Sequence, residues 1–327
     1  MIVVTGGAGF IGSNLVAALE AQGRGGVAIC DRLGTGAKWK NIAKRAPADI
    51  VAPERLFDFL GAYGREVEAV VHLGAISTTT ETDVDLILAE NFRLSMALWS
   101  WCARQGKRLI YASSAATYGD GRAGFDDDPS AEALAKLRPL NPYGWSKHIF
   151  DRRVTALLPT EAPRPPQHVG LKFFNVYGPN EYHKGAQRSV AHQLWERARA
   201  GEKARLFRSH NPDYADGGQL RDFIWVDDCV DVMLWFLDNP DKSGLYNVGT
   251  GKARSFLDLA RATYAAAGRN ADVEFVDTPE AMRAHYQYFT EARMERLRAA
   301  GYAKPFTALE DGVKQYVHIL DSSDPYR

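Results

Sequence analysis

The sequence predicts an α/β fold, a doubly wound parallel sheet followed by a smaller mixed domain towards the C-terminus. Three observations predict it. The chain opens on a β-branched apolar run at residues 2–4, glycines follow at a spacing of three, and a helical pattern begins at Ser13. Strand-like and helix-like patterns then alternate through the first half, as in parallel sheets with crossover helices. With 327 residues, the chain can form one large domain or two modest ones.

The glycine-rich turn predicts a phosphate-binding site. Gly6 would allow a tight turn, Gly9 would let the backbone approach a pyrophosphate, and Gly12 would let the helix pack closely on the strand. Phe10 and Ile11 lie in the same turn, where free backbone N–H groups and the helix dipole favour negative charge. A glycine-rich loop without a ligand remains the alternative for this pattern taken alone.

The second strand and the residues after it predict the cofactor. Residues 25–31 form an apolar run that ends in Asp31, where a dinucleotide fold places a ribose-binding carboxylate. Arg32 and Lys38 follow in the region where the 2′-phosphate of NADP would lie. The carboxylate favours the bare ribose of NAD, whereas two cations that reach the phosphate would outweigh it. We therefore predict NADP, with NAD as the alternative.

The composition excludes several classes of protein. Lys plus Arg equals Asp plus Glu, at 40 each, so the chain lacks the positive charge of a nucleic-acid binder. The three cysteines are far apart in the sequence, which predicts neither a metal site nor a disulfide framework. We expect no membrane span, because no apolar run approaches about 18 residues. The chain opens directly on a strand, which leaves no room for a signal peptide, and a cytoplasmic protein is expected.

The remaining elements are expected in the following order. Further strands are predicted at 48–50, 69–75, 108–114 and 169–177, and helices at 85–105 and 143–158. Gly106 is a natural end for the first of these helices. The loop at 119–142 carries an acidic triplet, 126–128, which is expected to be solvated. Beyond residue 178 we expect a helix at 186–200, a polar loop at 207–221, strands at 223–226 and 245–248 around a helix at 227–238, and a mainly helical tail from 256.

A pair of residues predicts the chemistry. Tyr143 and Lys147 lie at positions i and i+4, which on a helix puts both side chains on one face. A free tyrosine has a pKa of about 10, and a drop of about three units, caused by a nearby ammonium and a positive nicotinamide ring, would make it a competent base. Lys147 would also hold the nicotinamide ribose, and Ser114 would hydrogen-bond the substrate oxygen. A chance pair on a solvated helix is the alternative.

The glycine turn, Ser114 and the Tyr143–Lys147 pair together resemble the extended short-chain dehydrogenase/reductase superfamily, whose fold is of the Rossmann type. Within it, the chain is more similar still to the ADP-glyceromanno-heptose 6-epimerase family, over nearly its whole length. The similar stretches are 111–119, 139–147, 173–179, 183–185, 221–223 and 301–306. The sequence His183-Lys184-Gly185 is the most specific of these, whereas the glycine motif is shared by the whole superfamily.

The resemblance implies an activity and the residues that perform it. That family converts ADP-D-glycero-D-manno-heptose to the L-glycero form for lipopolysaccharide inner-core synthesis, uses tightly bound NADP and forms a homo-oligomer, a pentamer. By resemblance, Tyr143 and Lys184 are the two acid/base residues. The implied cofactor contacts further include Leu73, Gly74, Ala75, Ser77, Asn91, Lys147, Val176 and Lys184. The implied substrate contacts are Ser77, Asn175, Gln193, Phe207, Arg208, Ser209, His210, Arg221 and Tyr286.

The resemblance also implies a division into domains. Residues 1–175 with 222–255 would bind NADP, and residues 176–221 with 256–327 would bind the sugar nucleotide. The chain departs from the family at Leu73, which replaces a common acidic residue, at Pro53 and at Ala186, and its 207–221 loop is longer than in the shortest members. Nucleotide binding is therefore the part of the resemblance that these departures affect most.

Other functions are weighed against this one. A UDP-hexose 4-epimerase would leave the His183-Lys184-Gly185 segment unexplained. A 4,6-dehydratase needs an acid pair after the fifth strand, where this chain has Ala115 and Ala116. A non-catalytic dinucleotide-sensing protein could dispense with the tyrosine–lysine pair. For single residues, Lys184 as a surface lysine and Arg221 as an ion-pair partner of Asp222 or Asp227 remain alternatives.

Overall fold

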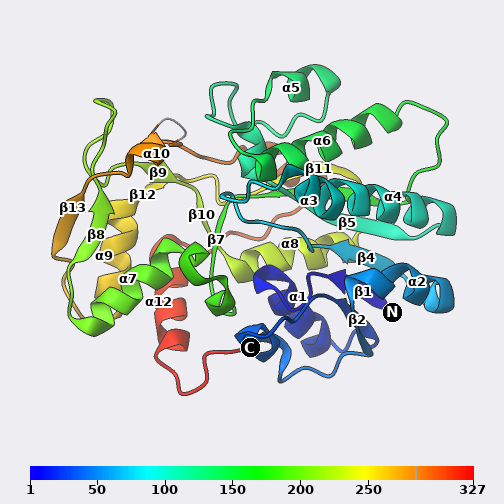
Figure 1. Ribbon diagram of the computed structural model, residues 1–327, viewed down its shortest axis with the longest axis horizontal. Helices are drawn as coiled ribbons and strands as arrows, with labels where there is room; N and C mark the ends of the chain where they lie inside the picture. Colours follow the sequence, from blue (N-terminus) through cyan, green and yellow to red (C-terminus); the bar gives the residue numbers. More distant parts are fainter. Residues whose placement is uncertain (284–285) are drawn as a thin grey trace.

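The computed structural model describes residues 1–283 and 286–327, and its centre is a sheet of seven parallel strands in the order β11-β6-β5-β4-β1-β2-β3 (Figure 1). These strands are β1 (Ile2–Thr5), β2 (Val27–Cys30), β3 (Asp49–Val51), β4 (Ala69–His72), β5 (Arg108–Ser114), β6 (His168–Phe173) and β11 (Gly244–Val248). The strand order reverses at β1, which pairs with β2 on one side and β4 on the other. Ligands bind at such a switch point, outside the carboxyl ends of the strands. The doubly wound parallel sheet predicted from the sequence is confirmed.

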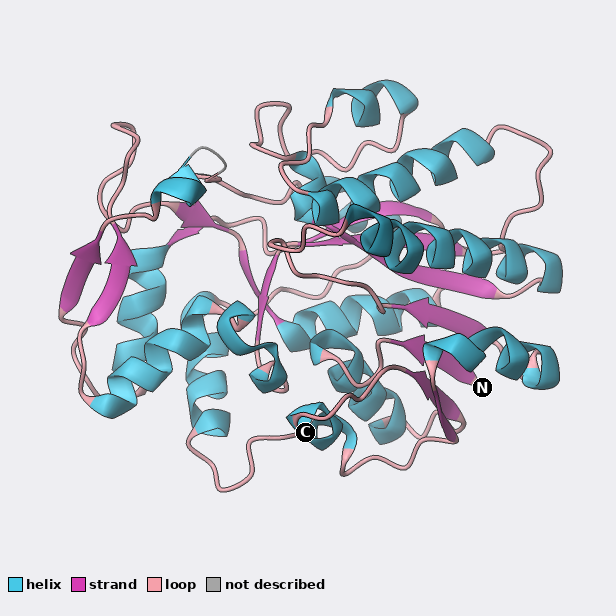
Figure 2. Cartoon of the chain, viewed as in Figure 1, coloured by secondary structure: helices cyan, strands magenta, loops and turns pink. Residues whose placement is uncertain are grey.

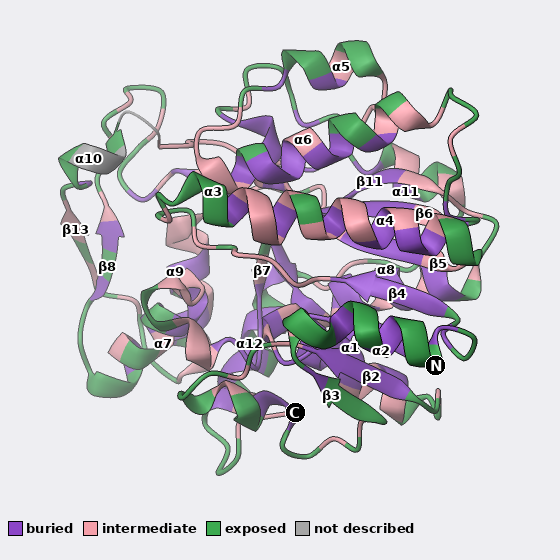
Figure 3. Cartoon of the chain, turned by 45° about the vertical axis from the view of Figure 1, so that its right-hand side comes forward, coloured by how far each residue is buried: buried purple, intermediate pink, exposed green. Residues whose placement is uncertain are grey.

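Helices cover both faces of this sheet (Figure 2). One face packs against α1 (Phe10–Ala21) and α8 (Val226–Asp238), and the other packs against α2 (Leu56–Tyr63), α4 (Leu94–Gln105) and α6 (Pro142–Leu157). Ile2 and Val4 belong to the first core and Val3 to the second, because successive side chains of a strand point to opposite faces. Figure 3 shows most of the sheet buried, whereas the edge strand β3 is largely exposed.

The helix predicted at 85–105 is present as three consecutive segments. It begins with α3 (Val84–Ile87), continues through the π-helical segment η3 (Leu88–Arg93), and ends with α4. Asp83 caps its start by accepting a hydrogen bond from the backbone of Leu86. Gly106 ends it in the left-handed conformation, with φ of 63°, as predicted.

The smaller part of the molecule has a core of its own. Three two-stranded sheets pair β7 (Asn175–Tyr177) with β10 (Phe223–Trp225), β8 (Ala204–Phe207) with β13 (Val273–Val276), and β9 (Leu220–Arg221) with β12 (Arg254–Ser255). The helices α7 (Val190–Ala200), α9 (Phe256–Ala266) and α12 (Leu309–Leu320) pack together around Trp225 and Tyr316. Part of the C-terminal segment packs instead on the core of the central sheet. It includes Leu297 of α11 (Glu295–Ala300) and Ala292, which lies just before this helix. The division into two domains stays a prediction.

The structure differs from the sequence-based expectation in several places. The strand predicted at 169–177 is two strands, since β7 leaves the central sheet and pairs with β10. The short strands β8 and β13 were not predicted, and α5 (Ala131–Lys136) lies within the expected loop. Asp127, in the acidic triplet expected to be solvated, is buried and accepts a hydrogen bond from the backbone N–H of Asn247 at 2.7 Å. Burial raises the pKa of Asp127 to about 6.

Within residues 1–283 and 286–327, every helix falls short of the length and apolar character needed to cross a membrane.

The glycine turn predicts a specific effect on stability. A Cβ atom at position 12 would lie 2.1 Å from the Gly6 carbonyl oxygen, so the turn cannot accept Gly12→Ala without moving. We expect this substitution to lower the free energy of unfolding by about 1–3 kcal/mol, as overpacking does. The control is Gly61→Ala in α2, where nothing lies within 4 Å of the new methyl group, and which should stabilise by up to about 1 kcal/mol. Equal effects in urea denaturation would contradict this account of the turn.

Candidate active site

A pocket at the carboxyl ends of the central strands brings most of the predicted site residues together. Its walls include Gly6, Gly9, Phe10, Ile11, Gly12, Asp31, Lys38, Leu73, Gly74, Ala75, Ser77, Ser114, Tyr143, Lys147, Val176 and Lys184. The same pocket is also lined by residues that were not predicted, namely Ala112, Ser113, Phe173, Phe174 and His183. The phosphate-binding turn, the acid after β2 and the tyrosine–lysine pair therefore share one cavity.

The glycine turn leaves backbone donors available to an anion. Gly6 adopts a φ of 69° and donates its N–H to the Cys30 carbonyl, so β1 turns sharply beside the end of β2. Gly9 is the N-cap of α1, and no side chain caps this end of the helix. The first N–H groups of an uncapped helix, together with its dipole, favour a phosphate. A turn of this kind, an acid beyond β2 and a tyrosine–lysine pair in one pocket fit a nicotinamide dinucleotide.

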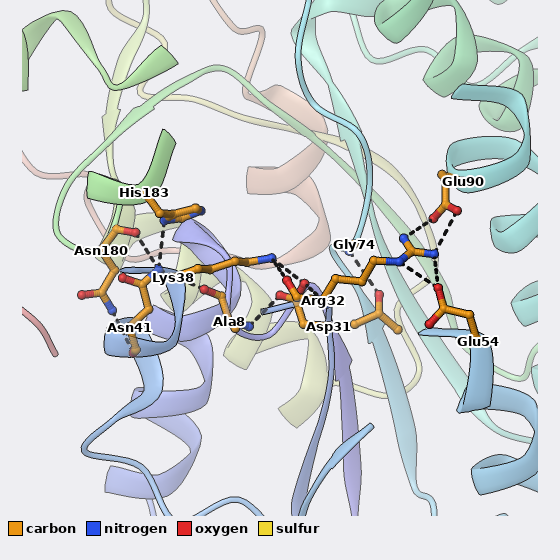
Figure 4. Close-up of polar contacts among 11 residues, drawn as sticks. Ala8, Asp31, Arg32, Lys38, Asn41, Glu54, Gly74, Glu90, Asn180 and His183 are labelled. Carbon is orange, nitrogen blue, oxygen red and sulfur yellow. Dashed lines mark hydrogen bonds and ion pairs between the residues drawn. The ribbon is translucent and has the colours of Figure 1, made fainter. Parts of the chain in front are cut away.

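The polar groups after β2 are shown in Figure 4. One oxygen of Asp31 accepts the backbone N–H of Ala8 at 2.9 Å, and the other accepts Lys38 Nζ at 2.5 Å. Arg32 differs from the prediction, because it is absent from the pocket walls. Its guanidinium instead donates to Glu54 at 2.6 Å and to Glu90 at 2.9 Å, on the other side of Asp31 from Lys38 (Figure 4).

Helix α6 positions the tyrosine–lysine pair. Asn141 caps its start by accepting the N–H of Gly144 at 2.8 Å, and Pro142 takes the first helical position, where a missing N–H costs nothing. Tyr143 therefore lies in the first turn and Lys147 in the second, on the face that lines the pocket. Ser114 ends β5 beside them, and its hydroxyl oxygen accepts the N–H of Ala116 at 3.1 Å.

The protonation of this pair is governed by burial. Burial raises the pKa of Tyr143, and its interaction with Ser114 acts in the opposite direction. Burial lowers the pKa of Lys147 to about 8, against the charge of Asp151 one turn further along α6. The expected fall in the Tyr143 pKa is thus not produced by the protein groups, since desolvation of the phenolate outweighs them. Positive charge from outside the chain would be needed to favour the phenolate.

Lys184 lies on the short helix η5 (Tyr182–Gln187), which follows β7. Its Nζ lies 5.4 Å from the centre of the Phe10 ring, at the start of α1. Burial lowers the pKa of Lys184, while the neighbouring Glu181 raises it. Lys184 also lines an adjoining cavity with Asn175, Gln187, Arg188, Phe223 and Phe256. Lys184 therefore lines both the pocket beside the glycine turn and this second cavity, which argues against an ordinary surface lysine.

Three asparagines that the sequence did not single out join the Lys184 turn to the glycine turn. Asn14 Nδ2 donates to the Pro179 carbonyl at 2.9 Å, and Asn180 Nδ2 donates to Ser13 Oγ at 3.0 Å. Asn41 Nδ2 lies 2.9 Å from the Ala8 carbonyl oxygen, 3.0 Å from that of Asn180 and 3.1 Å from His183 Nδ1 (Figure 4). All three are essentially buried. Buried amides demand partners, but a single sequence does not reveal which asparagines are buried.

Arg221 is a buried cation in an aromatic setting. Only 8% of its surface is exposed, and its guanidinium lies 5.5 Å from the ring centres of both Phe256 and Tyr286. The ion pair considered from the sequence is wrong. Asp222 accepts hydrogen bonds from Thr250, Gly251 and Ala292, and Asp227 pairs with Arg327. Among the described residues Arg221 has no carboxylate within salt-bridge distance, which suits a residue that binds an anionic ligand.

The other predicted substrate residues divide into two groups. Near Arg221, the Phe207 and Tyr286 rings lie 6.4 Å apart, and Asn175 lines the cavity beside Lys184. The rest face elsewhere or bond within their own loop. Arg208 lies 3.5 Å from Asp277, Ser209 bonds the Asn211 backbone, the His210 N–H meets Tyr288, and Gln193 bonds the Arg188 carbonyl on an exposed side of α7. These four stay predicted contacts, and like Phe207, Arg221 and Tyr286 they line neither of the two cavities.

Asn91 differs from its predicted role as a cofactor contact. It is fully buried, exchanges two hydrogen bonds with the backbone of Ile76, and donates to Ser146 Oγ at 3.0 Å. Ser146 in turn donates to the Tyr143 carbonyl at 2.7 Å. Asn91 therefore joins the loop after β4 to the first turn of α6. It supports the turn that carries Tyr143 but does not itself line the pocket.

Comparisons with known proteins agree with this geometry. The profile of the NAD dependent epimerase/dehydratase family matches residues 2–249. The chain is 49% identical, over 329 residues and the full length of both chains, to a protein of Nitratidesulfovibrio vulgaris named ADP-L-glycero-D-manno-heptose-6-epimerase. A protein of the same name from Fusobacterium nucleatum is 46% identical over 335 residues, again over the full length of both.

Solved structures show the same relationship. The Helicobacter pylori ADP-L-glycero-D-manno-heptose-6-epimerase superposes with a TM-score of 0.81 at 27% identity, covering 97% of this chain and 96% of that one. The Thermus thermophilus UDP-glucose 4-epimerase, solved in complex with NAD, superposes with a TM-score of 0.74 at 25% identity, covering 97% of each chain.

The setting of Arg221 predicts how the protein responds to ADP. With the dinucleotide pocket saturated, ADP should raise the melting temperature through the Arg221 site. Arg221→Met should weaken ADP at least about tenfold, because charge-assisted hydrogen bonds contribute about 1.5–3 kcal/mol. The control is Arg254→Met. Arg254 lies opposite Arg221 in the register of the two-stranded sheet, but its guanidinium already forms salt bridges with Asp258 and Glu310. Equal ADP affinity in the two variants would return Arg221 to a structural role.

Proposed function

The chain belongs to the NAD dependent epimerase/dehydratase family and, within it, to the ADP-L-glycero-D-manno-heptose-6-epimerases, and on this premise we propose how it works. It inverts C6″ of ADP-D-glycero-D-manno-heptose by transient oxidation and re-reduction, which provides a precursor of the lipopolysaccharide inner core. The observation that carries the mechanism is that two titratable groups, Tyr143 and Lys184, reach one pocket from separate segments of the chain.

A nicotinamide dinucleotide is the cofactor of this family. When bound, its oxidised nicotinamide supplies a hydride acceptor and a positive charge. The uncapped start of α1 would hold the pyrophosphate, Asp31 the adenosine ribose, and Lys147 the nicotinamide ribose. We propose NADP in preference to NAD, with Lys38 as the cation that already lies in the pocket and Arg32 as one that must first leave its glutamates.

Tyr143 is the proposed acid/base residue on the first face of the substrate. As the C6″–H bond breaks and the hydride leaves, its phenolate accepts the proton of the C6″ hydroxyl, so that a 6″-ketone is formed. Burial raises the pKa of this phenol, so its ionised form depends on positive charge from outside the chain, which a bound oxidised nicotinamide would supply. Ser114 orients the reacting oxygen by a hydrogen bond.

Lys184 is the proposed acid/base residue on the second face. The ketone turns within the site, which carries its oxygen away from Tyr143. When the hydride returns to the opposite face of C6″, the oxygen takes a proton from Lys184 and the L-glycero product is complete. Because burial lowers the pKa of Lys184, its ammonium gives up a proton more readily than that of an exposed lysine, and a larger fraction of the side chain is neutral and able to accept one.

The adjoining cavity is the proposed seat of the sugar nucleotide. Asn175 and Lys184 line it, and Arg221 with Tyr286 and Phe207 would hold the diphosphate end. Ser77, Gln193 and the loop at 207–221, with Arg208, Ser209 and His210, complete the contacts proposed by resemblance. A homo-oligomer, a pentamer, is proposed on the same basis. A UDP-hexose 4-epimerase or a non-catalytic sensor would leave Lys184 without a role.

The two-base mechanism makes a testable prediction. Tyr143→Phe and Lys184→Met should each lower epimerisation by at least about a hundredfold, a usual scale for losing a general acid or base. Each variant should still bind the dinucleotide, and each should still reduce it with only one of the two heptose epimers. Matched controls are Tyr63→Phe and Lys203→Met, at exposed positions that do not line the pocket. Near-normal turnover by Lys184→Met would mean that one tyrosine or a water serves both faces.

A further inference from the structure

The side chain that follows Asp31 is held away from the ribose site by two glutamates. Arg32 Nε and Nη2 lie 2.8 and 2.6 Å from one oxygen of Glu54, and Nη1 lies 2.9 Å from Glu90. Glu54 comes from η2 (Pro53–Arg55) at the start of α2, and Glu90 from η3 before α4. Every guanidinium nitrogen of Arg32 thus donates to a carboxylate on one of two other segments (Figure 4), and Arg32 is not among the residues that line the pocket.

The charges around Asp31 do not favour a phosphate as they stand. Three carboxylates, those of Asp31, Glu54 and Glu90, face two cations, Arg32 and Lys38. Lys38 is itself engaged, since its amine lies 2.5 Å from Asp31. A 2′-phosphate adds negative charge beside Asp31, and it therefore needs a cation that is released from its present partner. Arg32 is the cation best suited, because its planar fork matches phosphate oxygens.

We propose that Glu54 and Glu90 form a latch on Arg32 and that this latch determines how strongly the protein prefers NADP over NAD. The proposal rests on the dinucleotide cofactor of the proposed function and is independent of the sugar. With the latch closed, the ribose site presents Asp31 and suits a free 2′-hydroxyl. With the latch open, Arg32 is free to reach a 2′-phosphate.

The exposure of the latch makes this exchange feasible. The side chains of Arg32 and Glu54 are 52% and 61% exposed, and that of Glu90 is 24% exposed. Ion pairs between exposed side chains contribute little to stability, so Arg32 can leave them without disturbing the fold. A bidentate pair between arginine and phosphate is stronger than these exposed ion pairs. The two glutamates therefore reduce the affinity that Arg32 adds for the 2′-phosphate, but they do not abolish it.

The test is a competition between the two cofactors. The purified protein is equilibrated with equal excess concentrations of NADP⁺ and NAD⁺, freed of unbound dinucleotide by gel filtration, and the bound dinucleotides are quantified by mass spectrometry. Glu54→Gln with Glu90→Gln should raise the bound NADP:NAD ratio about threefold to tenfold, the range that two exposed ion pairs support. The control is Asp58→Asn with Glu66→Gln, which removes the same charge from exposed positions that do not touch Arg32.

Adding Arg32→Ala to the double glutamine variant and to its control shows whether the change in the NADP:NAD ratio depends on Arg32. If the latch acts through Arg32, this substitution should remove the whole gain of the double glutamine variant. A gain that survives Arg32→Ala would show that the glutamates act only through their general charge, and an unchanged ratio in the double variant would show that they do not act at all. Either result overturns the latch alone. If the unaltered protein retains neither dinucleotide, the latch and the proposed cofactor both fail.

Discussion

The contact between the glycine turn and the turn that carries Lys184 is the constraint on which the site depends. Asn14, Asn41 and Asn180 make it, and each is buried. The amide oxygens of Asn14 and Asn41 have no hydrogen-bond partner in the described part of the chain. Leaving a buried acceptor unpaired costs about 1–3 kcal/mol. These asparagines therefore stabilise the site through the hydrogen bonds that their amide N–H groups donate across the contact. They keep the second acid/base candidate beside the start of α1, where the cofactor phosphates belong.

Burial links this assembly to the chemistry. The packing that places Tyr143, Lys147 and Lys184 in one pocket also raises the pKa of the phenol and lowers the pKa of each amine. The lowered pKa of each lysine increases the fraction of its side chain that is uncharged. The raised pKa of the tyrosine makes it a weaker acid than it is in water. A protein that held these groups without a bound positive charge would be a poor base at Tyr143, so base strength and cofactor binding are coupled in this site.

How much the sequence predicts depends on the range of the interaction involved. The central sheet and its glycine turn follow from local patterns, and the Tyr143–Lys147 pair follows from helical spacing. The rotation of Arg32 away from the pocket depends on Glu54 and Glu90, which are 22 and 58 positions away in the chain. Asp127 is buried by a partner 120 residues further on. Such long-range partners decide where a polar side chain points, and no local pattern encodes them.

Direct hydride transfer at C6″ is the central claim, and its most direct test is epimerisation of ADP-D-glycero-D-manno-heptose in deuterated water. In this mechanism, a bound nicotinamide would accept the hydrogen from C6″ and give the same hydrogen back to the other face of that carbon, while only the hydroxyl proton would pass through Tyr143 and Lys184. The L-glycero product should therefore carry no deuterium at C6″ when its NMR and mass spectra are recorded. Deuterium at C6″ would mean that the carbon was deprotonated and reprotonated by solvent-exchanging groups, and it would contradict the oxidation and re-reduction on which the roles of Tyr143 and Lys184 rest.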